Sequence, residues 1–346
     1  MSGTKAVTRG TRFLALATLA GAAATAEAVA RAPQMTSPSP VALISEVPLP
    51  GRASRFDYQD VDERRGHLII AHMGDDELLV VRLRDGVTVA RLPGIRTVRG
   101  VRVAEQAGLI LATAAATDQL VRVDAASLSE IGRTATGSRP DGVDYDPVHR
   151  VVGVSDQRDG ALSLISDAGG GPRRQVRLGV ETGNVVFDPR RERFWITVVA
   201  GSGPDRLVAV DPASGAVTGA IDLAGCAGAH GLRLHPDGAS AYVACEENDL
   251  VARVGLSPPF PLVTARAGAG PDVLALDPGL GRLYVAAERG DLFVFDTNRP
   301  GLALVGRLRA GDNAHTVAVD PGTHRLYLPL PRGRAGGPVL QIGRSS

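Results

Sequence analysis

Residues 272–311 read DVLALDPGLGRLYVAAERGDLFVFDTNRPGLALVGRLRAG. The stretch contains four short runs of apolar and β-branched residues, at 272–278, 283–288, 292–296 and 302–311, separated by turns rich in Gly, Pro, Asp and Asn. Runs of this length between such turns are typical of β-strands. No segment after residue 40 shows the sustained spacing of an amphipathic helix. The stretch therefore predicts four antiparallel strands joined by tight turns.

The same unit recurs along the chain. The pair that ends the first run is Asp-Pro at 146, 188, 277 and 320, His-Pro at 235, Asp-Glu at 62 and Ala-Glu at 104. The spacing of about 42 residues between these seven anchors is that of four-stranded propeller blades. The sequence predicts an all-β protein, a seven-bladed β-propeller. Aromatic residues make up only 4% of the chain, so the core must be built mostly from Val, Leu, Ile and Ala.

The last copy of the repeat is one strand short. It supplies three runs between residues 314 and 343 and then the chain ends. The segment VALISEVPLPG at 41–51 has no partners of its own and matches the fourth-strand pattern of the sixth copy. We expect this N-terminal strand to complete the last blade, because ring closure leaves no long unpaired sheet edge.

Several of these strands resemble the repeats of YVTN-family propellers. The second strands AYVAC (241–245), LYVAA (283–287) and RLYLPL (325–330) carry the likeness, as do the first strands HGLRLHPDG (230–238) and AHTVAVDPGTHR (314–325). The likeness is greatest to the YncE-like group of exported bacterial proteins. It implies seven blades and a periplasmic setting. The Asn of the namesake tetrapeptide is replaced by Cys245, Ala287 and Leu330.

The N-terminus has the features of a secretory signal. A basic head containing Lys5, Arg9 and Arg12 precedes an apolar run at 13–24. We expect a cleaved signal over 1–30, a flexible leader over 31–40 and the propeller over 41–346, placing the mature protein in the periplasm or outside the cell. No later run is long enough to span a bilayer, and a net charge of +1 gives no field to attract nucleic acid. We expect a monomer.

Candidate ligand-binding residues begin the innermost strand of each blade. The position five before each anchor holds Asp57, Arg99, Asp141, Gly183, His230, Asp272 and His315. In the fourth copy the neighbouring Asn184 takes the place of the glycine as the candidate. A ring of polar groups above apolar packing is typical of a ligand site at the channel mouth. The alternative is that these groups bond neighbouring loops and keep the blades in register.

Three of these residues come from consecutive blades and could carry chemistry. His230, Asp272 and His315 could hold a divalent metal, with Asp57 as a further ligand, or could act as acid and base on a small substrate. No other cofactor is indicated. His72, which ends a second strand in the first blade, we interpret as a surface residue.

The two cysteines lie in one blade. Cys226 stands four residues before His230, and Cys245 ends the second strand of the same copy. Antiparallel pairing brings the start of the first strand and the end of the second to the same edge. In an oxidising compartment this placement predicts a disulfide between Cys226 and Cys245.

Three functions are compatible with these sequence features. The leading hypothesis is a non-enzymatic binding or scaffold protein that engages a small ligand or a partner protein at the channel mouth. The second is a lactonase- or lyase-like enzyme that uses His230, His315 and Asp272. The third is an accessory protein of a redox or metallo-enzyme system. The sequence has no phosphate-binding loop, dinucleotide fingerprint, nucleophile elbow or haem-attachment motif.

Overall fold

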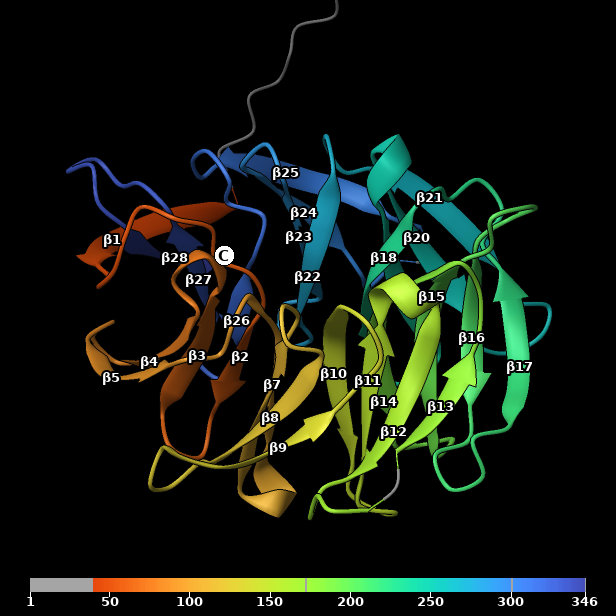
Figure 1. The fold of residues 1–346 in the computed structure, drawn as a ribbon. Helices are drawn as coiled ribbons and strands as arrows, with labels where there is room; N and C mark the ends of the chain where they lie inside the picture. The colour runs from red at the N-terminus through yellow and green to blue at the C-terminus, as the bar shows by residue number, and fades with distance from the viewer. Residues whose placement is uncertain (1–39, 172, 300, 346) are drawn as a thin grey trace, which may run out of the picture. The chain divides into compact units, whose positions relative to one another are not determined.

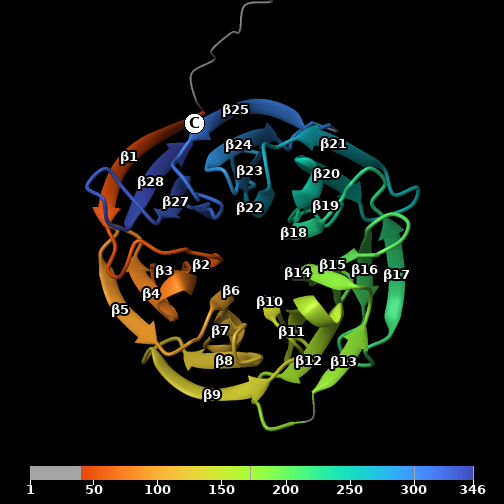
Figure 2. The same ribbon diagram turned by 45° about the horizontal axis from the view of Figure 1, so that its top comes forward.

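The computed structural model describes residues 40–171, 173–299 and 301–345, and within them every sheet is a four-stranded antiparallel sheet (Figure 1). There are seven such sheets, arranged around a central axis, and no α-helix among the described residues (Figure 2). The predicted all-β seven-bladed propeller is confirmed. The expected signal and all but the last residue of the leader lie outside the described residues. No helix in the described ranges is long and apolar enough to cross a bilayer.

The first four blades follow the chain, each running from the channel outward. Blade 1 consists of β2 (Gln59–Asp62), β3 (His67–His72), β4 (Glu77–Arg82) and β5 (Thr88–Pro93). Blade 2 consists of β6 (Val98–Ala104), β7 (Leu109–Ala114), β8 (Gln119–Asp124) and β9 (Ser129–Ala135). Blade 3 consists of β10 (Pro140–Asp146), β11 (Val151–Asp156), β12 (Ala161–Ser166) and β13 (Arg174–Arg177). Blade 4 consists of β14 (Glu181–Asp188), β15 (Arg193–Val199), β16 (Arg206–Val210) and β17 (Val217–Asp222).

Three further blades follow, and the N-terminal strand completes the last of them. Blade 5 consists of β18 (Ala229–Leu234), β19 (Ser240–Cys245), β20 (Leu250–Gly255) and β21 (Leu262–Arg266). Blade 6 consists of β22 (Pro271–Asp277), β23 (Arg282–Ala287), β24 (Asp291–Asp296) and β25 (Ala303–Arg309). Blade 7 consists of β26 (Ala318–Asp320), β27 (Arg325–Leu330), β28 (Val339–Ser345) and β1 (Val41–Pro48). The N-terminal strand β1 pairs antiparallel with β28, from Val41 opposite Ser345 to Pro48 opposite Val339, so the predicted closure is confirmed.

The core lies between neighbouring blades, because each sheet is apolar on both faces. Ile69 and Val80 of blade 1 pack with Val101 and Ile110 of blade 2, and the other interfaces repeat this arrangement with different aliphatic side chains. Aliphatic residues provide most of this packing, as the low aromatic content predicts. Because both faces of each blade are buried, the middle strands are almost continuous runs of apolar residues in the sequence.

A β-bulge in the innermost strand determines which side chains face the channel. In blades 2 to 6 the register with the second strand shifts near the start of the inner strand, for example between Val98 and Val101 and between Ala229 and Leu232. In a regular strand, residues an odd number apart point to opposite faces. The extra residue of a bulge changes that alternation. As a result Arg99 and Arg102, three positions apart, both line cavities of the channel, at opposite ends.

Candidate functional site

Five of the predicted collar residues surround one cavity. The collar is defined here as Asp57, Arg99, Asp141, His230 and Asp272, which precede β2 or lie in β6, β10, β18 and β22, the innermost strands around the axis (Figure 2). They line a cavity of about 350 Å³ at the end of the channel where these strands begin. The spacing rule from the anchors therefore brings these five side chains together.

The blades approach one another closely behind the collar, which holds its backbone in place. A Cβ on Gly100 would lie 2.1 Å from the carbonyl oxygen of Asp141, and one on Gly231 would lie 1.9 Å from that of Asp272. The Thr113 hydroxyl also donates to the Asp141 carbonyl, at 2.8 Å. Asp141 and Asp272 are thus each positioned by the preceding blade. These glycines and the hydroxyl were not recognised in the sequence.

A chain of ion pairs joins four collar residues. His230 Nε2 lies 3.3 Å from Asp141 Oδ2 and 3.7 Å from Asp272 Oδ1. Arg99 Nη1 lies 3.5 Å from Asp141 Oδ1. The Asp141 carboxylate therefore has cations on two sides, and the His230 imidazole has carboxylates on two sides.

These contacts and burial shift the pKa values of the collar groups in different directions. Burial lowers the pKa of His230, but Asp141 and Asp272 outweigh it and raise that pKa to about 10. Burial raises the pKa of Asp141, but the hydrogen bond from His230 and the charge of Arg99 outweigh it and lower the pKa to about 2. Asp57 is the opposite case, because burial and the negative charge of Asp141 raise its pKa to about 7. Burial raises the pKa of Asp272 as well. At neutral pH the pocket thus holds an imidazolium at His230 and a carboxylate at Asp141, while Asp57 titrates near neutrality.

A second group of ion pairs lies beside the collar. The sequence predicted Asp272 and His315 as site residues, but not the other two members of this group. Arg55 binds both oxygens of Glu288, at 2.7 and 3.2 Å, and its Nη2 lies 4.0 Å from Asp272 Oδ2. His315 is fully buried, with Nδ1 3.8 Å from Glu288 Oε2. Burial and the charge of Arg55 lower the pKa of His315 to about 4, so its ring is neutral at pH 7. Arg55 and Glu288 were missed because neither occupies the repeated collar position.

The predicted metal ligands do not all lie together. His230 belongs to the collar, whereas His315 lies beside Glu288 in the second ion-pair group. Among the described residues, Asp272, Glu288 and His315 offer ligand atoms within 4.8 Å of one another, whereas His230 is absent from this group. A neutral His and two carboxylates suit a divalent ion. The guanidinium of Arg55, however, already neutralises Glu288 from within the same group. We therefore assign no metal here.

His72 belongs to a separate buried cluster, and its interpretation as a surface residue is wrong. It is fully buried, stacks on Phe56 with ring centroids 4.2 Å apart, and contacts the Ser54 hydroxyl at 3.0 Å. Asp75 and Glu77 complete the cluster, and both carboxylates are bound by arginines, Arg52 and Arg91. These pairings favour a structural network that anchors the loop before β2.

Below the collar the channel narrows. Tyr58 and Asn184 line a cavity of about 20 Å³, room for one or two water molecules. Asn184, a predicted ligand-binding residue, therefore lies deeper than the collar cavity. In this part of the channel and the collar, Tyr58 Oη, Arg99 Nε and Asp272 Oδ1 are buried without a hydrogen bond to any described residue. Buried polar atoms are rarely left in this state, so these three are free to bond a ligand or water.

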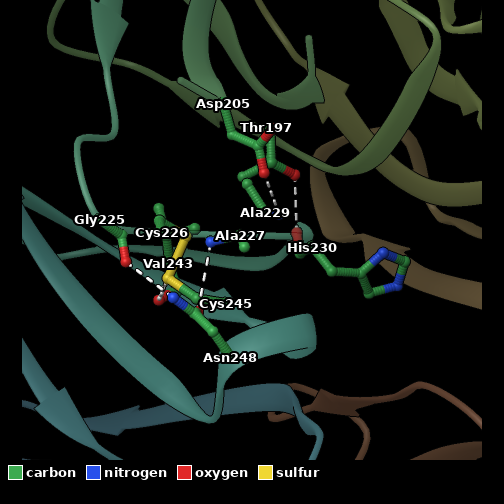
Figure 3. Close-up of a disulfide and its surroundings, with 10 residues drawn as sticks. All are labelled: Thr197, Asp205, Gly225, Cys226, Ala227, Ala229, His230, Val243, Cys245 and Asn248. Atoms are coloured by element: carbon green, nitrogen blue, oxygen red, sulfur yellow. Dashed lines mark hydrogen bonds between the residues drawn. A yellow bond between two sulfur atoms is a disulfide. The ribbon is translucent and has the colours of Figure 1, made fainter. Parts of the chain in front are cut away.

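The predicted disulfide is present beside the collar (Figure 3). Cys226 and Cys245 are bonded, with an S–S distance of 2.08 Å and a Cα–Cα distance of 5.2 Å. Asn248 Oδ1 accepts from the Ala227 amide and Asp205 Oδ2 from the Ala229 amide, at 3.2 and 2.9 Å. The His230 ring points away from the disulfide (Figure 3). The bond thus fixes the loop that leads directly into His230.

Comparisons with known proteins show the fold alone. No family model matches the chain, and no curated protein sequence matches it. Among solved structures, the chain is similar to hydrazine synthase of Kuenenia stuttgartiensis, with a TM-score of 0.70 and 16% identity over 78% of this chain and 91% of that one. It is also similar to virginiamycin B lyase of Staphylococcus aureus, with a TM-score of 0.70 and 12% identity over 87% of this chain and 99% of that one. At these identities the likeness carries no residue roles.

Proposed function

We propose that the protein is an exported binding protein that takes a small polar ligand in the collar cavity. The observation that carries this proposal is a pair of buried polar atoms, Arg99 Nε and Asp272 Oδ1, that have no hydrogen bond to any described residue and belong to residues lining a cavity of about 350 Å³. A ligand that bonds these atoms would remove the cost of leaving them unpaired, on the order of 1–3 kcal/mol each.

The charges of the site favour a neutral ligand. Asp141 is already balanced by Arg99 and His230, and Glu288 by Arg55. A charged ligand that bonded to Asp141 or Glu288 would have to displace one of these pairs. Asp57, by contrast, has a pKa raised to about 7, so it can donate as well as accept hydrogen bonds near neutral pH. Alternating donors and acceptors suit a polyol or a monosaccharide.

The test is ligand-observed NMR and calorimetry with glucose, ribose, sorbitol and myo-inositol. At least one should bind, and the Arg99→Gln variant should weaken that binding about tenfold or more. Arg307→Gln is the matched control, because Arg307 is exposed on the outer strand β25 and lies outside the cavity. If no member of the set binds, or if both variants behave alike, the proposal is wrong.

The separated pKa values favour one alternative, an acid–base enzyme. An imidazolium at His230 could donate a proton, and Asp57, with a pKa of about 7, could accept one. The reaction class would be lactone opening or elimination. A panel of lactones followed by pH-stat titration tests it: turnover that is lost in His230→Gln supports the enzyme, and no turnover in the native protein counts against it.

We also infer that the chain is a YncE-like member of the YVTN family and reaches the periplasm or the exterior. The amino-acid sequences of the repeats and the N-terminal signal pattern support this inference. The Cys226–Cys245 disulfide is consistent with an oxidising compartment. Mass spectrometry of the protein from a bacterial periplasmic fraction should show cleavage near residue 30. Retention of the intact N-terminus in the cytoplasm would contradict export.

A further inference from the structure

The channel has a second mouth, at the end opposite the collar, with a cavity of its own. We define this far mouth by Gln59, Glu63, Glu105 and Arg233, which line a cavity of about 340 Å³. Glu63 and Glu105 lie just beyond the ends of β2 and β6, and Arg233 lies near the end of β18, whereas the collar lies at the beginnings of the inner strands. The narrow part at Tyr58 and Asn184, about 20 Å³, lies between the two cavities. The far mouth is therefore a separate site.

One wall of the far mouth is anionic. Glu63 and Glu105 come from blades 1 and 2, and neither side chain has a hydrogen bond or ion pair to another described residue. Burial and the neighbouring Asp320, Glu105 and Asp60 raise the pKa of Glu63, which shows that carboxylates crowd together here. Such crowding creates a negative potential that attracts a cationic group.

One residue that lines the far mouth has a buried, unpaired acceptor. Gln59 is 1% exposed and lines the far mouth. Its Nε2 donates to the Tyr327 carbonyl oxygen at 3.0 Å, which fixes the orientation of the amide. Its Oε1 is left without a hydrogen-bond partner in the described part of the chain. A donor from a ligand would satisfy this atom.

The opposite wall carries an unpaired cation. Arg233 lies in β18, across the ring from β2 and β6 (Figure 2). Its Nε donates to the Leu274 carbonyl at 2.8 Å, and no carboxylate of the described residues lies within ion-pair distance of the guanidinium. Arg102, in the same cavity, differs because Asp144 and Asp60 already neutralise it, at 2.7 and 3.3 Å. Only Arg233 is therefore available for an anionic group.

We propose that the far mouth binds a small zwitterion of the amino-acid type, with its ammonium group at Glu63, Glu105 and Gln59 and its carboxylate at Arg233. An ammonium group has three N–H donors and no acceptor, which matches two carboxylates and an amide oxygen. A guanidinium binds a carboxylate through two parallel hydrogen bonds. Both walls line one cavity, so one molecule with both charges can engage them together.

The experiment is calorimetric titration of the whole mature chain with ω-amino acids of increasing length: glycine, β-alanine, γ-aminobutyrate and ε-aminocaproate. At least one should bind in the millimolar range or tighter. Butylamine and butyrate, which carry only one of the two charges, should bind at least tenfold more weakly. If no member of the series binds, or if the single-charge compounds bind equally well, the proposal is overturned.

Variants locate the binding. Glu105→Gln and Arg233→Gln should each weaken it about tenfold or more, whereas the collar variant Arg99→Gln should leave it unchanged. The thermal unfolding of both far-mouth variants is measured in parallel, so that loss of binding is separated from loss of fold. Binding that responds to Arg99→Gln and not to Arg233→Gln would place the zwitterion in the collar and overturn this assignment.

Discussion

His230 Nε2 lies 3.3 Å from Asp141 Oδ2, although the two residues belong to blades 5 and 3. Blade 4 lies between them in the ring, and its residue at the collar position is Gly183. A Cβ on Gly183 would lie 2.6 Å from His230 Cα. The missing side chain therefore lets His230 reach across a whole blade to its carboxylate.

Replacement of Gly183 by alanine should break this contact. The new Cβ would also lie 2.6 Å from Thr197 Oγ1, so β18 must shift. We expect a loss of about 1–3 kcal/mol in the free energy of unfolding and a fall in the pKa of His230. Urea unfolding and NMR titration of the imidazole measure the two effects. Gly219→Ala is the control, because nothing lies within 4 Å of its Cβ position; equal behaviour of the two variants would refute the explanation.

The contribution of His230 to stability should depend on pH. Its folded-state pKa of about 10 lies above the ordinary 6.5, so its stabilising effect is fully present below pH 6.5 and is lost as the pH rises through 10. The difference in unfolding free energy between native protein and His230→Gln should therefore shrink by on the order of 5 kcal/mol over that range. Urea unfolding at several pH values measures it. A difference that does not change with pH would show that the ring is not charged in the folded protein.

Removal of β1 should open the propeller. A chain that begins at Arg52 lacks the outer strand of blade 7 and leaves β28 as an unpaired edge. We expect a loss of several kcal/mol in unfolding free energy and increased self-association, because free edges pair with other chains. Thermal unfolding and light scattering measure these effects. The control begins at Pro38, ahead of β1. Equal stability of both chains would mean that β1 contributes nothing to closure.

Loss of the disulfide should act on the collar loop first. The double variant Cys226→Ser, Cys245→Ser removes a cross-link between residues 19 apart, which predicts a loss of about 3 kcal/mol in unfolding free energy. Hydrogen exchange should rise at the Ala227 and Ala229 amides, which belong to the clamped loop. Amides of β7 in blade 2 serve as the internal reference. Unchanged exchange in the loop would mean that Asn248 and Asp205 hold it without the cross-link.

The strands, the number of blades and the closure followed from the sequence alone. These features depend on local alternation of apolar residues and on a repeat of about 42 residues, which a single chain displays directly. The disulfide was predictable for the same reason, since Cys226 and Cys245 fall at one edge of one hairpin. The anchor spacing also placed Asp57, Arg99, Asp141, His230 and Asp272 around one cavity.

Only the tertiary structure decided which charges meet. His230 pairs with Asp141 across blade 4, and Arg55 pairs with Glu288 across blade 7. Position in a repeat determines the height of a side chain along the channel. It does not determine how far that side chain reaches across the channel, because its reach depends on the size of the residues between, such as Gly183. The far mouth stayed hidden for a related reason, since whether Arg233 and Glu105 are paired depends on neighbours contributed by other blades.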